Sequence, residues 1–229
     1  MPARHPERIV CLTEESTETL YLLGEERRIV GISGYTVRPP RARREKPRVS
    51  AFLSARIGKI VELKPDLVIG FSDLQADIAR DLARAGLNVL IFNQRSVQQI
   101  LDMILALSAL VGATDRGLKL VKDLEDGLAQ VRESAKAFPR RPRVYFEEWD
   151  EPMISGIRWV SELVEIAGGE DIFPDLSCSQ GATGRIVADP FKRTAHLVPL
   201  LTMRRRALQA LVRRPLLRDR PVAQQRPAH

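Results

Sequence analysis

The feature that most constrains the fold is a long stretch, from residue 96 to residue 138, that has helical periodicity and no strand pattern. Gly112 divides this stretch into two helical segments. The second segment has roughly two dozen residues and would be about 36 Å long at ~1.5 Å per residue. A helix of that length can cross between two lobes, so the sequence predicts a helical backbone with a separate unit at each end.

The part of the chain before this stretch alternates short apolar runs with amphipathic segments. Such alternation is typical of a mainly parallel sheet, whose strands are covered by helices on both faces. The predicted strands span residues 9–12, 29–32, 67–70 and 88–92. After the prolines at 139 and 142, an apolar run at 143–146 predicts a further strand, and a helix beginning near Trp159 is predicted to end at Gly168 and Gly169.

We therefore predict an α/β fold with two Rossmann-like lobes, whose mainly parallel sheets are joined by a long backbone helix. The predicted units are an N-terminal α/β lobe at 1–93, a helical linker or backbone at 94–138, an incomplete C-terminal α/β lobe at 139–190 and a basic tail at 191–229.

The net charge of +7 is concentrated at one end of the chain. Residues 191–229 hold ten Lys and Arg and one Asp, a net charge of +9, whereas the other residues carry 26 Lys and Arg and 28 Asp and Glu, a net charge of −2. A nucleic-acid-binding surface over the body is therefore not expected.

The inventory of catalytic residue types argues against common enzymes. The three histidines, His5, His196 and His229, lie near the ends of the chain, so a Ser-His-Asp or Cys-His arrangement and an imidazole metal site are not expected in the body. Cys11 and Cys178 lack metal-ligand spacing, and Cys11 is expected to be a small core residue. A hydrolase using the carboxylates of Glu147 and Glu148 is a minor alternative, although adjacent strand residues point in opposite directions.

Targeting signals do not stand out in the chain as written. The residues before 9–12 do not form an apolar segment of the ~7–15 residues that a secretion signal requires, and no run approaches the ~18 apolar residues of a membrane span. These observations predict a cytoplasmic chain without a membrane span.

Ligand sites of open α/β sheets lie outside the carboxyl ends of the strands. Four predicted loops qualify, at residues 13–16, 33–40, 71–75 and 147–156. They contain Tyr35, Phe71 and Trp149, whose aromatic rings suit a large, partly apolar ligand. Trp159 either faces the same ligand or packs in the core beneath its helix.

An ordered set of segments resembles the ABC-transporter substrate-binding proteins with a helical backbone, and among them the vitamin B12 (cobalamin)-binding branch. The matching segments include Thr-Glu-Thr-Leu-Tyr-Leu-Leu-Gly at 17–24, Val-Gly-Ile-Ser-Gly-Tyr at 30–35, Leu-Lys-Pro-Asp-Leu-Val-Ile at 63–69 and Ala-Gly-Gly-Glu-Asp-Ile-Phe at 167–173. The resemblance covers residues 7 to 190. It implies a monomeric, non-catalytic protein in the periplasm or at the cell surface, which carries no cofactor or metal and holds a small-molecule ligand, cobalamin, between two lobes.

The resemblance also implies roles for individual residues. By position, Tyr35 and Phe52 would contact the ligand from the first lobe and Trp149 from the second. Acidic residues on each lobe would contact arginines of an ABC permease, and Asp77 lies near the expected place in the first lobe.

The resemblance ends near residue 190, where the expected strands and helices of a second lobe are replaced by Arg-, Leu- and Pro-rich sequence. We interpret the change as a frameshift near codon 190; the alternative is a genuine basic tail. If the tail is genuine, the alternative function is a cytoplasmic regulatory or interaction protein with a degenerate binding fold, in which the tail contacts a partner.

Overall fold

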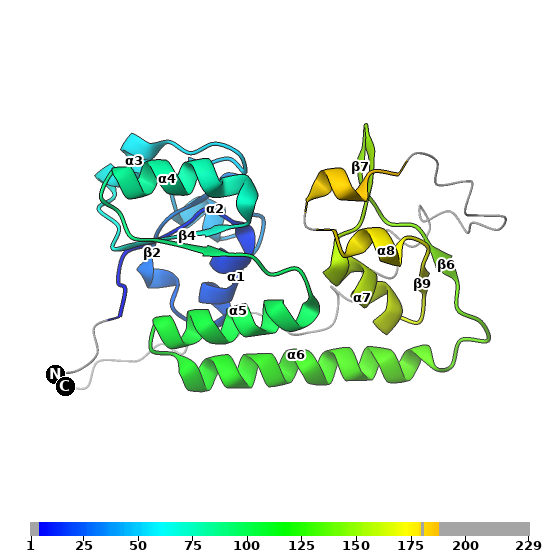
Figure 1. The fold of residues 1–229 in the computed structure, drawn as a ribbon. Helices are drawn as coiled ribbons and strands as arrows, with labels where there is room; N and C mark the ends of the chain where they lie inside the picture. The colour runs from blue at the N-terminus through cyan, green and yellow to red at the C-terminus, as the bar shows by residue number, and fades with distance from the viewer. Residues whose placement is uncertain (1–4, 180, 188–229) are drawn as a thin grey trace, which may run out of the picture.

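The computed structural model describes residues 5–179 and 181–187. Figure 1 shows two α/β lobes side by side, with the paired helices α5 (Val97–Leu110) and α6 (Thr114–Ala135) beneath them. The predicted α/β class with a mainly parallel central sheet is confirmed. The tail predicted at 191–229 and the frameshift near codon 190 lie outside the described residues.

The sheet of the first lobe has five parallel strands in the order β3-β2-β1-β4-β5. Strand β1 lies at its centre and is fully enclosed, with Ile9, Val10 and Cys11 each at 0% exposure. The strands are β1 (Ile9–Cys11), β2 (Ile29–Ser33), β3 (Arg48–Ser50), β4 (Leu67–Phe71) and β5 (Val89–Phe92).

Successive residues of β1 enter two different cores because side chains alternate across a strand. Ile9 and Cys11 pack with α1 and α5, whereas Val10 packs with α3 and α4 on the opposite face. Cys11 is the small core residue that the sequence predicts, and burial raises the pKa of its thiol to about 12. The helices of this lobe are α1 (Glu14–Leu22), α2 (Ala42–Glu45), α3 (Ile57–Glu62) and α4 (Ala76–Arg84), with 3₁₀ turns η1 (Glu26–Arg28) and η2 (Asp73–Gln75).

Helices α5 and α6 form an antiparallel pair joined by a turn at Gly112, whose φ of 71° favours glycine. Ser96 and Gln99 form a capping box at the start of α5. At 22 residues, α6 is the long helix that the sequence predicts. The pair approach each other closely at Gly117, where a Cβ atom would overlap the side chain of Ser108.

The described part of the second lobe has two small sheets around a modest core. Tyr145 and Phe173 pack edge to face at 5.6 Å, and Ile172 and Val187 complete the core. Strands β6 and β9 are parallel, and β7 and β8 form an antiparallel hairpin. The elements are β6 (Arg143–Val144), β7 (Glu147–Asp150), β8 (Met153–Ser155), α7 (Arg158–Ile166), β9 (Glu170–Asp171), α8 (Pro174–Ser177) and the 3₁₀ turn η3 (Ala182–Arg185).

The hairpin corrects the sequence prediction for this region. The sequence predicts a strand at 143–146 and a loop at 147–156, but β6 ends at Val144 and β7 begins at Glu147. Cross-strand pairing of Trp149 with Ile154 and of Asp150 with Met153 orders the segment. The acidic run hid a strand because its side chains are exposed, so it lacks the apolar alternation by which half-buried strands are found.

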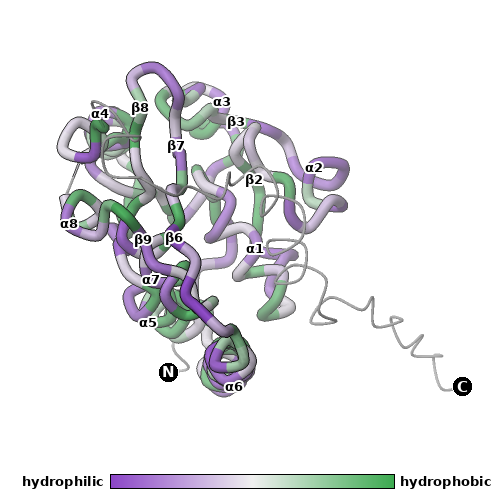
Figure 2. Tube along the Cα trace, turned by 90° about the vertical axis from the view of Figure 1, so that its right-hand side faces the viewer, coloured by the Kyte–Doolittle hydropathy of each residue, from purple (hydrophilic) through white to green (hydrophobic). Residues whose placement is uncertain are grey.

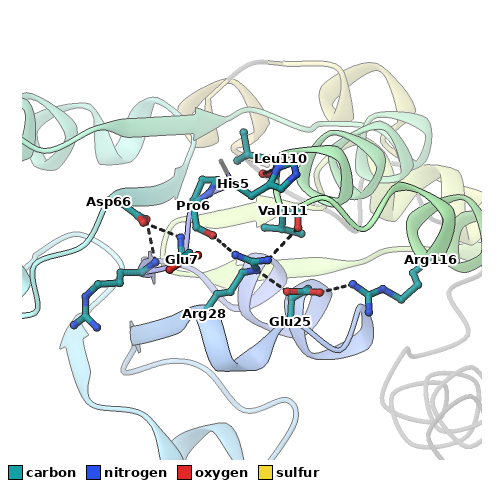
Figure 3. Close-up of polar contacts among 10 residues, drawn as sticks. His5, Pro6, Glu7, Glu25, Arg28, Asp66, Leu110, Val111 and Arg116 are labelled. Atoms are coloured by element: carbon teal, nitrogen blue, oxygen red, sulfur yellow. Dashed lines mark hydrogen bonds and ion pairs between the residues drawn. The ribbon is translucent and has the colours of Figure 1, made fainter. Parts of the chain in front are cut away.

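A charged cluster joins the first lobe to the helical pair (Figure 3). Glu25 follows α1 and has a side chain that is only 5% exposed; it accepts hydrogen bonds from Arg28 at 2.5 Å and from Arg116 on α6. Arg28 also donates to the carbonyl oxygen of Pro6 at 2.7 Å. Burial raises the pKa of Glu25, but the two guanidinium groups outweigh that effect and lower the pKa below its usual range.

We expect opposite stability changes at two glycines of α6. Gly117→Ala should lower the free energy of unfolding by about 1–3 kcal/mol, because the added methyl group must displace Ser108 or separate the helices. Gly127→Ala should raise it by about 0.5–1 kcal/mol, because nothing lies within 4 Å of the new Cβ and alanine favours the helix. Urea denaturation of both variants tests the close approach; a stabilised Gly117→Ala protein would contradict it.

Glu25 should make stability depend on pH in the acid range. Its folded-state pKa is depressed, so its contribution is complete above the unfolded-state pKa of about 4.3 and is lost as the pH falls through the lower folded-state value. Glu25→Gln should cost about 2–3 kcal/mol at pH 7. The difference between wild type and variant should shrink below about pH 4. Denaturant titrations between pH 3 and 7 measure this difference, and a constant gap across that range would refute the assignment.

Candidate functional site

The carboxyl ends of the first-lobe strands face the second lobe (Figure 1). The last strand, β5, leads directly into α5, whose first backbone N–H, that of Val97, donates to Glu162 on α7 at 2.7 Å. Glu162 also accepts from Arg158 at 2.8 Å. The second lobe is therefore fixed to the helical backbone beside the strand ends, and the loops that follow the strands form one wall of the candidate ligand site.

Three aromatic residues predicted for the site lie on this wall. Tyr35 follows β2 and is 66% exposed. Phe52 follows β3 and is half-buried. Phe71 ends β4, is also half-buried, and lies under the guanidinium of Arg95 at 5.5 Å from the ring centre. Because all three lie at the carboxyl ends of strands of one parallel sheet, the fold collects them along one edge of that sheet.

Gln75 fixes two of these aromatic segments to each other, a role that the sequence does not reveal. Its side chain is fully buried, donates to the carbonyl oxygen of Phe52 at 3.0 Å and accepts from the backbone N–H of Phe71 at 3.0 Å. Gly70 leaves room for it, since a Cβ there would lie 2.7 Å from the Gln75 side-chain oxygen. Ser72, which directly follows Phe71, has φ 62° and ψ 170°, a strained conformation for a residue other than glycine.

The two tryptophans lie on separate elements of the second lobe. Trp149 is in β7, is 61% exposed and donates its indole N–H to the carbonyl oxygen of Glu151 at 3.0 Å. Trp159 is the second residue of α7 and is half-buried. Arg185 supports the hairpin that carries Trp149: it is 3% exposed, donates to the carbonyl oxygen of Ser155 at 2.9 Å and pairs with Glu148.

Two polar residues at the strand ends, Glu15 and Gln94, were not among the predicted site residues. Glu15 follows β1 and accepts from Gln94, which follows β5, at 3.3 Å. Burial raises the pKa of Glu15, while hydrogen bonds, including those from Thr13 and Gln94, oppose the rise. Gln94 is 8% exposed, and its side-chain oxygen has no hydrogen-bond partner among the described residues. Residues 13–16 belong to a predicted site loop, but contact with the distant Gln94 is visible only in the folded chain.

Asp77, the predicted permease-contact residue, lies in the first turn of α4. Its side chain is 85% exposed and pairs with Arg80 at 2.6 Å. Within residues 5–179 and 181–187, no group of three metal-ligating side chains is assembled. The same part of the chain contains no helix long and apolar enough to cross a membrane.

Comparison with known proteins identifies the class. A sequence model of the periplasmic binding protein family matches residues 9–226. The chain belongs to that family, which confirms the resemblance drawn from its segments.

One relative and two solved structures show which proteins this chain is similar to. The vitamin B12-binding protein of Vibrio cholerae serotype O1 is 30% identical over 174 residues, which are 74% of this chain and 62% of that protein. The crystal structure of the periplasmic vitamin B12-binding protein of Vibrio cholerae superposes with a TM-score of 0.63 at 29% identity, covering 74% of this chain and 67% of that one. A possible iron-binding periplasmic protein of Staphylococcus epidermidis, with a TM-score of 0.66, 19% identity and coverage of 75% and 69%, shares the fold.

The Gln75 linkage can be tested by its loss. Gln75→Leu should lower the free energy of unfolding by about 2–4 kcal/mol, because the Phe71 N–H and the Phe52 carbonyl oxygen lose their shared buried partner. Gln98→Leu, on the exposed side of α5, is the matched control and should change stability by less than about 0.5 kcal/mol. Equal effects in urea denaturation would show that Gln75 does not hold the two segments.

Proposed function

We propose that this protein is the substrate-binding component of an ABC importer and that it holds a corrinoid ligand between its two lobes. The observation that carries the proposal is the similarity to the vitamin B12-binding protein of Vibrio cholerae, at 30% identity across 74% of this chain. The chain spans 62% of that relative's length, so the ligand and the importer are inferences for this protein.

The aromatic residues at the strand ends support a large ligand with an extended face. Tyr35 and Trp149 are 66% and 61% exposed, so their aromatic rings are accessible to a ligand. They belong to different lobes, so a flat macrocycle could contact one ring on each side. A bare metal ion would need imidazole, thiolate or carboxylate clusters instead.

The proposal includes no catalytic step. The potential acid–base residues of the hairpin serve other contacts: Glu148 pairs with Arg185, and Glu147 is exposed beside the aromatic core of the second lobe. Transport would instead require a docking surface, for which Asp77 on α4 is the proposed contact with a basic permease residue. As a member of an importer, the protein would act in the periplasm or at the cell surface.

Haem is a second candidate ligand, favoured by one observation. Tyr35 presents an exposed phenol at the strand ends, and tyrosine is one of the side chains that ligate haem iron. A corrinoid already carries its own axial groups and does not require this oxygen, so the two ligands make different demands on Tyr35.

Titration of the purified chain with cyanocobalamin tests the proposal. We expect saturation at one equivalent by equilibrium dialysis. Trp149→Ala should weaken binding about tenfold or more, because a large buried contact is lost. Trp149→Phe should retain most of the affinity, whereas Phe138→Ala, which removes a 54% exposed ring outside the strand-end loops, should leave it unchanged.

Titration with haemin distinguishes the two candidate ligands. Binding of haemin with a Soret shift that Tyr35→Phe abolishes, and no binding of cyanocobalamin, would replace the corrinoid by haem. Failure of a cooperatively folded sample to bind either ligand would reject the transport proposal and favour an interaction protein with a degenerate binding fold.

A further inference from the structure

A second concave site lies on the first lobe, around the edge strand β3. This basic groove has a volume of about 870 Å³ and is lined by five cationic side chains, Arg43, Lys46, Arg48, Arg56 and Lys59. The remaining lining residues are neutral, so no carboxylate faces it within the described part of the chain. The aromatic residues of the proposed corrinoid site do not line it.

The backbone brings these cations together from three segments. Arg48 begins β3, and the chain then turns back along that strand, with hydrogen bonds from Ala51 to Ser54 at 2.8 Å and from Arg56 to Val49 at 2.9 Å. The turn places Arg56 beside the edge strand, where α3 begins. It also covers the edge of the sheet, so the groove is not an open edge waiting for another strand.

The two short helices that flank β3 contribute the other three cations. Arg43 lies three residues before Lys46 across the end of α2, and Arg56 lies three residues before Lys59 at the start of α3. Lys46 is the cap residue that ends α2 and Arg56 the cap residue that precedes α3, so each short helix together with its cap residue contributes two positive charges to the groove. Figure 2 shows the hydrophilic character of α2 beside β3.

The groove cations differ from neighbouring arginines because no carboxylate of the described residues neutralises their charge. Arg38 pairs with Glu18 at 3.1 Å and Arg41 pairs with Glu26 at 2.9 Å. None of the five groove cations forms an ion pair or a side-chain hydrogen bond with another described residue. Glu45, the acid on α2, instead accepts from Tyr21 at 2.8 Å.

Five positive charges around one concavity repel each other and raise the local potential, which favours a bound anion. A neutral donor is also present. Ser50 lines the groove, and its hydroxyl oxygen is enclosed and has no hydrogen-bond partner among the described residues. Anion binding would relieve the repulsion among the cations, and a rotation of the Ser50 side chain would let its hydroxyl group donate to the anion.

We propose that the basic groove binds a polyanion that presents two or more phosphate groups close together. Arginine forks suit the geometry of phosphate oxygens, and three of the five cations are arginines. The volume exceeds what a single phosphate needs and falls in the range of small-molecule sites. A soluble polyphosphate and the headgroups of an anionic membrane share this chemistry, and the experiment separates them.

Isothermal titration of the full chain with inorganic tripolyphosphate is the test. We expect one saturable site whose Kd rises about tenfold for Arg56→Gln and further for Arg56→Gln with Lys59→Gln, because charge-assisted hydrogen bonds are lost. Arg84→Gln, an equal charge change on the exposed face of α4, should leave the Kd within about twofold. Binding of cyanocobalamin should be the same in all three variants.

Sedimentation with phosphatidylcholine vesicles, with and without phosphatidylglycerol, distinguishes the source. Saturable binding of free tripolyphosphate that depends on Arg56 and Lys59 supports a soluble ligand. Binding confined to phosphatidylglycerol vesicles, and lost in the same variants, supports lipid headgroups. Absence of both, or binding that Arg84→Gln weakens as much as Arg56→Gln does, would overturn the proposal. Unchanged thermal unfolding of the exposed-residue variants confirms that folding is not the cause.

Discussion

Helix α5 is the element on which both lobes depend. Its apolar residues Leu101, Ile104 and Leu107 are 0–5% exposed and close one face of the first-lobe sheet. Its N-terminal amide at Val97 is held by Glu162 of the second lobe, a carboxylate at the positive end of the helix dipole. On its other side, α6 packs closely enough that Gly117 meets the side chain of Ser108. One helix therefore sets the position of the sheet, the second lobe and the long helix that spans them.

This shared helix has a consequence for the ligand site. A site between two freely moving lobes must be ordered when the ligand binds, which consumes part of the binding free energy. Here the strand ends are fixed relative to α7 by the Val97–Glu162 hydrogen bond, and Gln75 holds the Phe52 and Phe71 segments to each other. Contacts within the protein thus hold the first-lobe wall of the site, including the strained backbone at Ser72, in place.

Apolar spacing along the sequence was sufficient to predict most of the elements whose side chains face a core. Four of the five strands in the first lobe, the two helices after Ser96 and the burial of Cys11 follow from apolar spacing, because these residues face a core. Strand β3 was not predicted, because Val49 is its only apolar residue. The β7–β8 hairpin does not follow from it, since the side chains of β7 are exposed and do not face a core. Its order comes from cross-strand pairing, which is a property of two segments rather than one.

The same limit applied to the polar parts of the site. Aromatic residues could be assigned to the strand ends because the carboxyl edge of a parallel sheet is defined by strand positions alone. The Glu15–Gln94 contact and the two hydrogen bonds of Gln75 join residues that are far apart in the chain, and no local pattern encodes them.

The cations of this protein fall into two groups: those that pair with a carboxylate, and those that have no such partner among the described residues. Arg28 pairs with Glu25 and donates to the carbonyl oxygen of Pro6. Arg185 pairs with Glu148 and donates to the carbonyl oxygen of Ser155. Both arginines are largely buried and hold separate segments of the chain together. The groove cations are mostly exposed and converge without an acid, so they contribute repulsion rather than cohesion. Net charge gives no sign of this difference, because residues 1–190 carry −2 in total. The functional information lies in where a positive charge lacks a partner, and that is a property of the fold.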